Sequence, residues 1–479
     1  MKKIFIISGL LVFAVSCRKD ITSLNVDPKK PDIVPSYTLF SNAQKNLANN
    51  MASPNVNLNI WRLISQYWTE TTYTDESNYD LVTRNIPQSW WHTMYRDVLK
   101  NLDDCSKLIP TDVLNSDGTK NVGKQKNEQA IIDILKVFTY HHIITVFGNI
   151  PYTEALDFNN LQPKYDDAKT VYSALIAKLS AAISNLDDSQ EGFGEADLLY
   201  NGDIDSWIKF GNSLKLKMGM LMADYDATAA KTAVESAYAG AFTSNDDNAS
   251  FQFLSAPPNT NPIWVNLVQS GRKDFVAGKT IVNTMAALND PRIPLYFTED
   301  ANGTYSGGKI GASNNYGTYS KPSLTIQDPS FPTIFMDYSE VEFLLAEAKE
   351  RGFNVPGTAE EHYDNAITAS IENWGGSALD ATTYLAQPSV AYSTAAGTYK
   401  QKIGTQKWIA LFDRGLDAWT EFRRLDYPVL VAPTSALTPF PMRFTYPVSE
   451  QNLNKTNYAA AATAIGGDKV ETKLWFDKF

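Results

Sequence analysis

The chain has 479 residues, of which 43% are hydrophobic and 20% charged, and its formal net charge is −11. This length and composition indicate a packed globular body, large enough for two or three average domains or one large helical array. The negative charge argues against nucleic acid or an anionic lipid surface as a partner.

The first residues have the pattern of an exported protein. Lys2 and Lys3 precede an uncharged, mostly apolar run over residues 4–16, and Cys17 follows it. A basic start, a short apolar run and small residues before the cleavage site predict a signal peptide. The run is too short to span a hydrocarbon core of about 30 Å. A cysteine as first mature residue resembles a bacterial lipoprotein signal, although Ala14 stands where Leu is usual. An ordinary signal peptide with a chance cysteine is the alternative.

We therefore expect a signal peptide over residues 1–16, a lipidated tether over 17–35 and a single helical domain over 36–479. Several acyl chains on Cys17 would hold the protein stably on a membrane. The tether is polar and contains three prolines. Cys105 is the one cysteine of the body, so the fold uses no internal disulfide, and we expect it in the core of a helix over 90–108. No later stretch is long and apolar enough to suggest a membrane span.

The body shows a series of helical patterns. Residues 131–147 are apolar nearly all round, which predicts a buried helix. Apolar residues at spacings of three and four predict amphipathic helices over 172–186, 207–222, 341–348, 363–374 and 408–419. Short alternating pieces at 248–253 and 443–448 could pair as small ribbons. Long irregular stretches occur at 69–89, 243–278, 298–333 and 375–403. The pattern predicts a mainly α fold of tetratricopeptide-like helical pairs with long irregular loops and a few short β-ribbons.

Aromatic residues gather between positions 61 and 91, interleaved with Thr, Asp, Glu and Asn. A flat aromatic ring can cover the apolar face of a sugar, while polar neighbours bind its hydroxyls. We expect Trp61 and Trp68 in the core, and one of the adjacent Trp90 and Trp91 to be exposed or half-exposed. The candidate ligand-binding residues are Tyr73, Asp75, Glu76, Tyr79, Trp90, Trp91 and Trp264.

Catalytic chemistry is not indicated. His141 and His142 are adjacent, so on a helix they point about 100° apart and cannot share a metal. A buried imidazole with its hydrogen bonds made is the expected state for most of the four histidines. No GxSxG, HExxH, P-loop or GxGxxG motif is present, and 53 acidic residues make chance carboxylate pairs certain. The sequence therefore predicts no catalytic residue, no cofactor, no metal site and no enzyme activity.

Five segments, taken in order, resemble one family. They are residues 66–77 (QYWTETTYTDES), 147–152 (FGNIPY), 290–294 (DPRIP), 406–424 (QKWIALFDRGLDAWTEFRR) and 443–447 (RFTYP). With the Cys17 signal, they resemble the SusD/RagB family of outer-membrane nutrient-binding lipoproteins, in its SusD-like second branch. The resemblance implies a tetratricopeptide-like scaffold overlaid by an irregular region. It also implies a position over a SusC-like TonB-dependent transporter, and a ligand that is usually a glycan and sometimes a peptide.

Two of these segments carry charges whose role can be predicted. Residues 408–424 read as one amphipathic helix whose charges form its surface, with a structural role in core packing and ion pairs. Arg292 is expected to satisfy a structural carboxylate or carbonyl groups.

The leading functional expectation is a lipid-anchored binder on the outer membrane, facing outward, that hands nutrient to a transporter. Two alternatives remain. A lipid-anchored glycoside hydrolase would need two carboxyls about 5–9 Å apart in a cleft. A protein-interaction scaffold would present a smooth concave groove.

Overall fold

The computed structural model describes residues 34–478, so the predicted signal peptide, Cys17 and most of the tether lie outside the described residues. The described chain is mainly helical, as predicted. Its α-helices are α2 (Ser36–Ala52), α3 (Trp61–Ile64), α4 (Ile86–His92), α5 (Lys100–Asp112), α6 (Val122–Phe147), α7 (Ala168–Asn185), α8 (Ile204–Leu221), α9 (Ala227–Ala237), α10 (Pro262–Trp264), α11 (Lys279–Ala287), α12 (Ile293–Tyr296), α13 (Tyr338–Glu350), α14 (Ala359–Asn373), α15 (Ala378–Leu385), α16 (Tyr399–Ala410), α17 (Gly415–Leu425), α18 (Val448–Leu453) and α19 (Lys455–Ala464).

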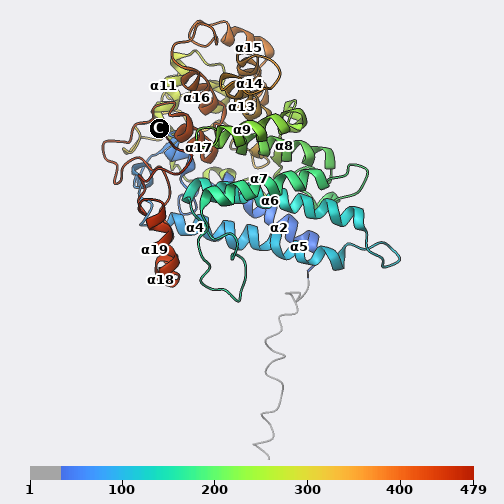
Figure 1. The fold of residues 1–479 in the computed structure, drawn as a ribbon. Helices are drawn as coiled ribbons and strands as arrows, with labels where there is room; N and C mark the ends of the chain where they lie inside the picture. The colour runs from blue at the N-terminus through green and yellow to red at the C-terminus, as the bar shows by residue number, and fades with distance from the viewer. Residues whose placement is uncertain (1–33, 479) are drawn as a thin grey trace, which may run out of the picture.

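The long helices pack in pairs, most of them consecutive in the chain. Helix α2 packs on α5, α6 on α7, α8 on α9, and α13 on α14. Figure 1 shows them stacked from α5 and α2 on the lower side, through α6 and α7, to α8 and α9. A π-helical segment, η3 (Thr93–Leu99), joins α4 to α5 without a break. This arrangement confirms the helical-pair scaffold. We call these stacked helices, with α16 and α17, the helical scaffold.

Helix α6 is the centre of the scaffold. It is long and apolar enough to cross a membrane by length and composition, contrary to the sequence prediction, but 89% of its apolar window is buried inside the protein. It is therefore a core helix, as its all-round apolar pattern predicted. His141 and His142 lie on it fully buried, and bond to the Tyr172 hydroxyl at 2.8 Å and to Asp417 at 3.3 Å. Cys105 is also buried in the core, where burial raises the pKa of its thiol to about 12.

The strands are short and pair over long sequence separations. Strand β1 (Trp68–Glu70) pairs antiparallel with β3 (Phe275–Ala277), and β2 (Ala249–Phe251) pairs with β4 (Thr333–Met336). The piece at 248–253 thus contains a strand, as predicted. The piece at 443–448 is not a strand; Phe444 instead donates a backbone hydrogen bond to the Val146 carbonyl, 3.0 Å away.

The single helix predicted over residues 408–419 is wrong. The chain ends α16 at Ala410, turns through Asp413 with a positive φ of 72°, and starts α17 at Gly415. Gly415 packs on the backbone of Trp61, where a Cβ atom would lie 2.5 Å from a carbonyl carbon. The break thus lets α17 approach α3 more closely than any larger residue would allow.

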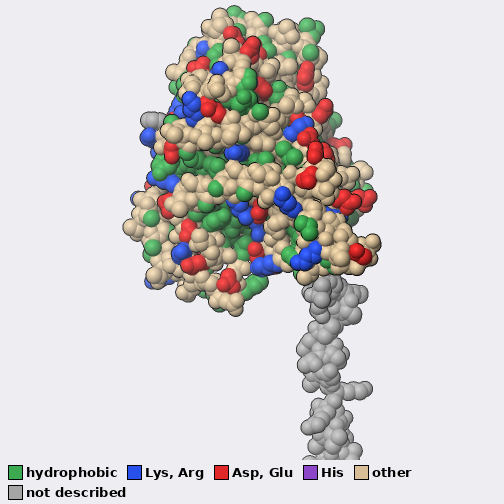
Figure 2. Space-filling model, turned by 45° about the vertical axis from the view of Figure 1, so that its right-hand side comes forward, with side chains coloured by type: hydrophobic (Ala, Val, Ile, Leu, Met, Phe, Trp, Pro, Cys, Tyr) green, Lys and Arg blue, Asp and Glu red, His purple; other side chains and the backbone are tan. Residues whose placement is uncertain are grey.

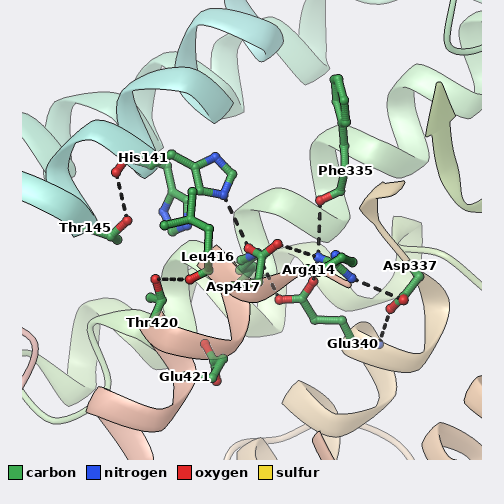
Figure 3. A network of polar contacts seen from close by, with 12 residues as sticks. His141, Thr145, Phe335, Asp337, Glu340, Arg414, Leu416, Asp417, Thr420 and Glu421 are labelled. Carbon is green, nitrogen blue, oxygen red and sulfur yellow. Dashed lines mark hydrogen bonds and ion pairs between the residues drawn. The ribbon is translucent and has the colours of Figure 1, made fainter. Parts of the chain in front are cut away.

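The predicted charged surface of residues 408–424 is also wrong, because most of these charges are buried (Figure 3). Arg414 contacts Glu340 at 2.5 Å, Asp417 at 3.0 Å and Asp337 at 3.2 Å. Lys217 from α8 adds a second cation, 2.9 Å from Glu340 and also paired with Asp417. We call these five residues the buried ion network. It ties α8, α13 and α17 together.

Electrostatics within the network favour the ionised form of Asp417, whereas burial raises the pKa of Asp337. Burial alone would raise the pKa of Asp417, but Lys217 and Arg414 hold it well below its ordinary value. The predicted ion pairs of this segment are therefore present, but they lie in the interior. Arg292 behaves as predicted: it is fully buried and pairs with Asp290 at 2.6 Å.

Candidate ligand-binding surface

Three irregular segments are joined by backbone contacts beside the β1–β3 ribbon. The Thr71 amide donates to the Asp274 carbonyl at 2.8 Å, and the Asn314 amide donates to the Thr71 carbonyl at 2.9 Å. The Asn314 side chain donates to the Glu70 carbonyl at 2.9 Å. We call the segments 70–80, 270–278 and 300–321 the loop platform. Their mutual hydrogen bonds hold the loops in fixed positions despite their lack of long helices or strands.

Tyr73 is the most exposed aromatic side chain of the platform. Its side chain is 74% exposed, and its backbone has a positive φ of 55°. A bulky residue in the left-handed region is uncommon and costs conformational energy. Such strain persists where surrounding structure enforces it, and it is often found at binding sites. The platform therefore presents a large ring to solvent in a defined orientation.

Charged side chains and a second aromatic ring lie on the same platform. Arg272 forms an exposed ion pair with Asp274 at 2.5 Å, and this hydrogen-bonded carboxylate raises the pKa of Arg272. The Tyr316 ring is half-buried and lies 5.7 Å from the Lys273 ammonium and 5.3 Å from that of Lys321. Rings bordered by cations, carboxylates and amides are suited to ligands with both an apolar face and a polar edge.

The predicted Asp75 and Glu76 take different positions. Asp75 is exposed, whereas Glu76 is 1% exposed and pairs with Arg84. Glu76 lies beside Glu70, which is itself buried under the loop and accepts a hydrogen bond from the Ser77 amide at 2.8 Å. Burial raises the pKa of Glu70 to about 8, and Glu76 adds to the shift. These two carboxyls therefore support the loop from beneath instead of facing a ligand.

Three candidate aromatic residues are buried, although Tyr79 and one of Trp90 and Trp91 were expected at the surface. Tyr79 is 0% exposed, and burial raises its pKa to about 12. Trp90 is 0% and Trp91 6% exposed. Both faces of α4 are covered, since Trp90 packs edge-on against Trp61 at 5.0 Å and Trp91 against Phe147 at 5.0 Å. Trp61 and Trp68 are core residues, as predicted.

Trp264 is partly exposed, so it remains a candidate. It ends α10 and leads through the π-helical η7 (Val265–Gln269) into the 270–278 segment of the platform. Sequence reasoning missed Arg272 and Tyr316. The one available signal for Tyr316 was its position between Asn315 and Gly317 in a long irregular stretch.

Trp91 forms part of a second feature, an apolar groove of about 300 Å³. The groove lies between η3, the loop after α6 and α18. Phe158 and Leu161 on its rim are 76% and 81% exposed, and Leu453 of α18 is 71% exposed. Gln162 donates to the Leu453 carbonyl at 2.8 Å, which joins the two rim segments. Sequence reasoning missed this groove as well, although apolar residues in a polar loop were its signal.

This geometry defines a class of protein in which a helical-repeat scaffold carries a fixed loop platform with aromatic side chains. A family model described as "Starch-binding associating with outer membrane", SusD-like_2, matches residues 28–447. The chain therefore belongs to the SusD-like family, as the sequence resemblance indicated. A comparison with curated protein sequences finds no match.

Solved structures of SusD homologues share the fold. A chitin-binding SusD homolog from Flavobacterium johnsoniae is 27% identical, with a TM-score of 0.77 over 92% of this chain and 97% of its own. A SusD homolog from Bacteroides thetaiotaomicron is 25% identical, with a TM-score of 0.78 over 93% of this chain and 100% of its own. A third SusD homolog, from Bacteroides uniformis, is 25% identical, with a TM-score of 0.77 over 92% of this chain and 100% of its own.

Proposed function

We propose that this protein is a non-enzymatic outer-membrane lipoprotein that binds glycan oligomers on the loop platform. The observation that carries the proposal is Tyr73, an exposed ring held in a strained backbone conformation among charged neighbours. Tyr316 would provide a second ring, and Asp75 and Arg272 would bind hydroxyl groups. The starch named in the family description and the chitin named for the F. johnsoniae homologue support a sugar polymer as ligand.

The glycan proposal is tested by calorimetric titration of the purified protein with chitin and starch oligomers of increasing length. We expect weak binding that strengthens until the oligomer spans the platform, because each stacked ring adds to the affinity. A peptide of similar size is the comparison ligand. Absence of binding to every glycan, with binding to the peptide, would reject the glycan class.

The hydrolase alternative is tested in the same samples. The Glu70 and Glu76 carboxyls lie under the loop with little exposure, and a glycosidase needs its two carboxyls in contact with substrate and water. We expect no new reducing ends after prolonged incubation with a bound oligomer. Sustained turnover, abolished by Glu70→Gln, would favour the enzyme.

We propose that Cys17 anchors the protein and that a SusC-like TonB-dependent transporter is its partner. The exposed apolar rim of the groove supports a protein contact, because contiguous exposed apolar residues often mark interfaces. In Figure 1, the loop after α6 and α18 extend on the lower side, where the described chain begins at α2. An anchored tether would bring that side toward the membrane.

Co-purification from native membranes in mild detergent tests the partner. We expect a large β-barrel protein to accompany the wild type and to be lost from the double variant Phe158→Ser and Leu161→Ser. Leu379→Ser is the matched control, since Leu379 is 73% exposed on α15, at the other end of the molecule. For the anchor, Cys17→Ala should release the protein from the membrane fraction. Retention of that variant would refute lipidation as the anchor.

A further inference from the structure

Two lysine side chains converge on one aromatic ring of the loop platform. The Tyr316 ring is half-buried, and the ammonium groups of Lys273 and Lys321 lie 5.7 Å and 5.3 Å from its centre. Neither lysine forms an ion pair with a carboxylate of residues 34–478. The three side chains therefore combine a flat apolar surface with two positive charges that the described chain does not balance.

The backbone holds all three residues in place. The Thr71 hydroxyl donates a hydrogen bond to the Lys273 carbonyl at 2.6 Å. The Thr298 amide donates to the Lys321 carbonyl at 2.9 Å. The turn over residues 315–318, which carries the ring, is closed by a backbone hydrogen bond of 3.0 Å. The ring and the two lysine backbones are thus positioned before any ligand arrives, which lowers the cost of binding.

Unbalanced lysines are unexpected in this protein, because its formal net charge is −11. Figure 2 shows acidic side chains along the edge of the body above the start of the described chain. Two carboxylates of the platform are engaged elsewhere. Asp274 pairs with Arg272 at 2.5 Å. Asp300 accepts hydrogen bonds from the Thr304 and Ser306 hydroxyls at 3.0 Å and 2.6 Å.

The pairing of two cations with one ring limits what can bind beside it. A single ammonium group near a ring is explained by cation–π attraction. A second ammonium group at the same ring adds repulsion between like charges. An anion bound by both lysines would offset that repulsion through charge-assisted hydrogen bonds, while the ring covers the apolar face of the sugar that carries the anion. A neutral sugar would use the ring alone.

We propose that Lys273, Tyr316 and Lys321 form a site for an acidic sugar, one that carries a carboxylate or sulfate group within the glycan. The inference rests on the proposed glycan function and narrows its ligand to acidic glycans. Tyr316 stacks on the sugar ring, and the two ammonium groups bind its anionic group and fix the direction in which the oligomer lies on the platform.

Two matched pairs of ligands test the site by calorimetric titration. A short oligogalacturonate is compared with its methyl ester, and a sulfated galactan oligomer with its desulfated form. Within each pair the sugar backbone is the same and the charge differs. We expect the acidic member of at least one pair to bind roughly three- to thirtyfold more tightly at low salt, because two exposed ion pairs add to its affinity. High salt should narrow the gap, since mobile ions screen exposed charges. The pair with the larger gap identifies the anionic group as carboxylate or sulfate.

The double variant Lys273→Gln and Lys321→Gln should bind the acidic and neutral members about equally. The matched control is Lys120→Gln with Lys126→Gln, which removes the same charge from exposed side chains around the start of α6 and should keep the gap. No gap in either pair for the wild type, or a gap that survives the double variant, would overturn the inference. If neutral oligomers alone bind, the glycan function stands and the acidic class is rejected. Binding of no glycan, neutral or acidic, would reject both.

Discussion

The helical scaffold and the loop platform contain ion pairs of the same length in opposite surroundings. Arg414 and Glu340 in the scaffold are 2.5 Å apart with side chains 6% and 0% exposed. Arg272 and Asp274 on the platform are also 2.5 Å apart, but their side chains are 61% and 31% exposed. The distance between the charged atoms is therefore no measure of how much an ion pair contributes to stability. Burial decides whether losing one partner leaves an unpaired charge in the interior or only a solvated one.

This comparison predicts two kinds of mutational effect. Changes in the scaffold should alter stability and leave ligand binding per folded molecule intact. Changes on the platform surface should do the reverse.

The largest effect is expected for Arg414→Gln. The substitution leaves Asp337, Glu340 and Asp417 facing one cation, Lys217, in the interior. Removing one partner of a buried network typically costs about 3–5 kcal/mol. Urea unfolding followed by circular dichroism measures the loss. The control, Arg272→Gln, should cost less than about 1 kcal/mol. Equal losses for the two variants would contradict the comparison.

A similar loss is expected for Trp90→Ala, in a residue that the sequence placed among the ligand candidates. Trp90 is fully buried against Trp61, and truncating a buried tryptophan costs about 3–5 kcal/mol. Trp90→Phe, which leaves a smaller void, should lose less. Glycan affinity, measured by calorimetry and corrected for the folded fraction, should match the wild type. Lower affinity with unchanged stability would restore Trp90 to the ligand site.

The sequence predicted elements whose signal is local. An apolar run predicted α6, and the 3.6-residue period predicted α7 and α8. The position of Cys105 within a predicted helix indicated its burial. The β1–β3 ribbon could not be predicted from the sequence, because three-residue strands show no period. Its Trp68 pairs with Ala277, which is far along the chain. The platform depends on that ribbon. Tyr73 and Asp75 could therefore be predicted as exposed loop residues, but their neighbours in space could not.

Burial from distant segments explains the remaining errors. Trp91 is covered by Phe147 and Tyr446, and Arg414 is neutralised by Glu340. None of these three partners is near in sequence. An amphipathic pattern shows that two faces differ, but it does not show that a second layer covers the polar face. The charged surface predicted for residues 408–424 failed for this reason.

A smaller, local effect is expected from Glu70, which is buried at the start of the platform's first segment. Its pKa in the folded loop is about 8, above its ordinary value of 4.5. The folded loop therefore holds a proton that the opened loop releases between these values. Stability from this group is fully present below about pH 4.5 and is lost as the pH rises through about 8. Hydrogen exchange of residues 71–79, corrected for intrinsic rates, should show easier opening from pH 6 to 8.

Glu70→Gln should remove that pH dependence, since an amide does not titrate. The exchange of α6 amides in the same samples is the internal control and should show no matching change. If the loop opens equally at both pH values in the wild type, Glu70 is not protonated and the proposed support beneath the platform is wrong.

The smallest effect on stability, and the largest on binding, is expected for Tyr73→Ala. An exposed ring contributes little to the core, and alanine removes a bulky side chain from the strained position. Loss of a stacking platform should cost about 1–3 kcal/mol of binding, roughly five- to a hundredfold in affinity. Calorimetry with the tightest-binding glycan measures this loss of affinity. Tyr73→Phe keeps the ring and removes the hydroxyl group, so it should retain most of the affinity. Val82→Ala is the matched surface control, because Val82 is 75% exposed in the stretch that follows the platform's first segment. If Tyr73→Ala binds as well as Val82→Ala, the ligand surface lies elsewhere, and the strained conformation of Tyr73 serves the packing of the platform alone.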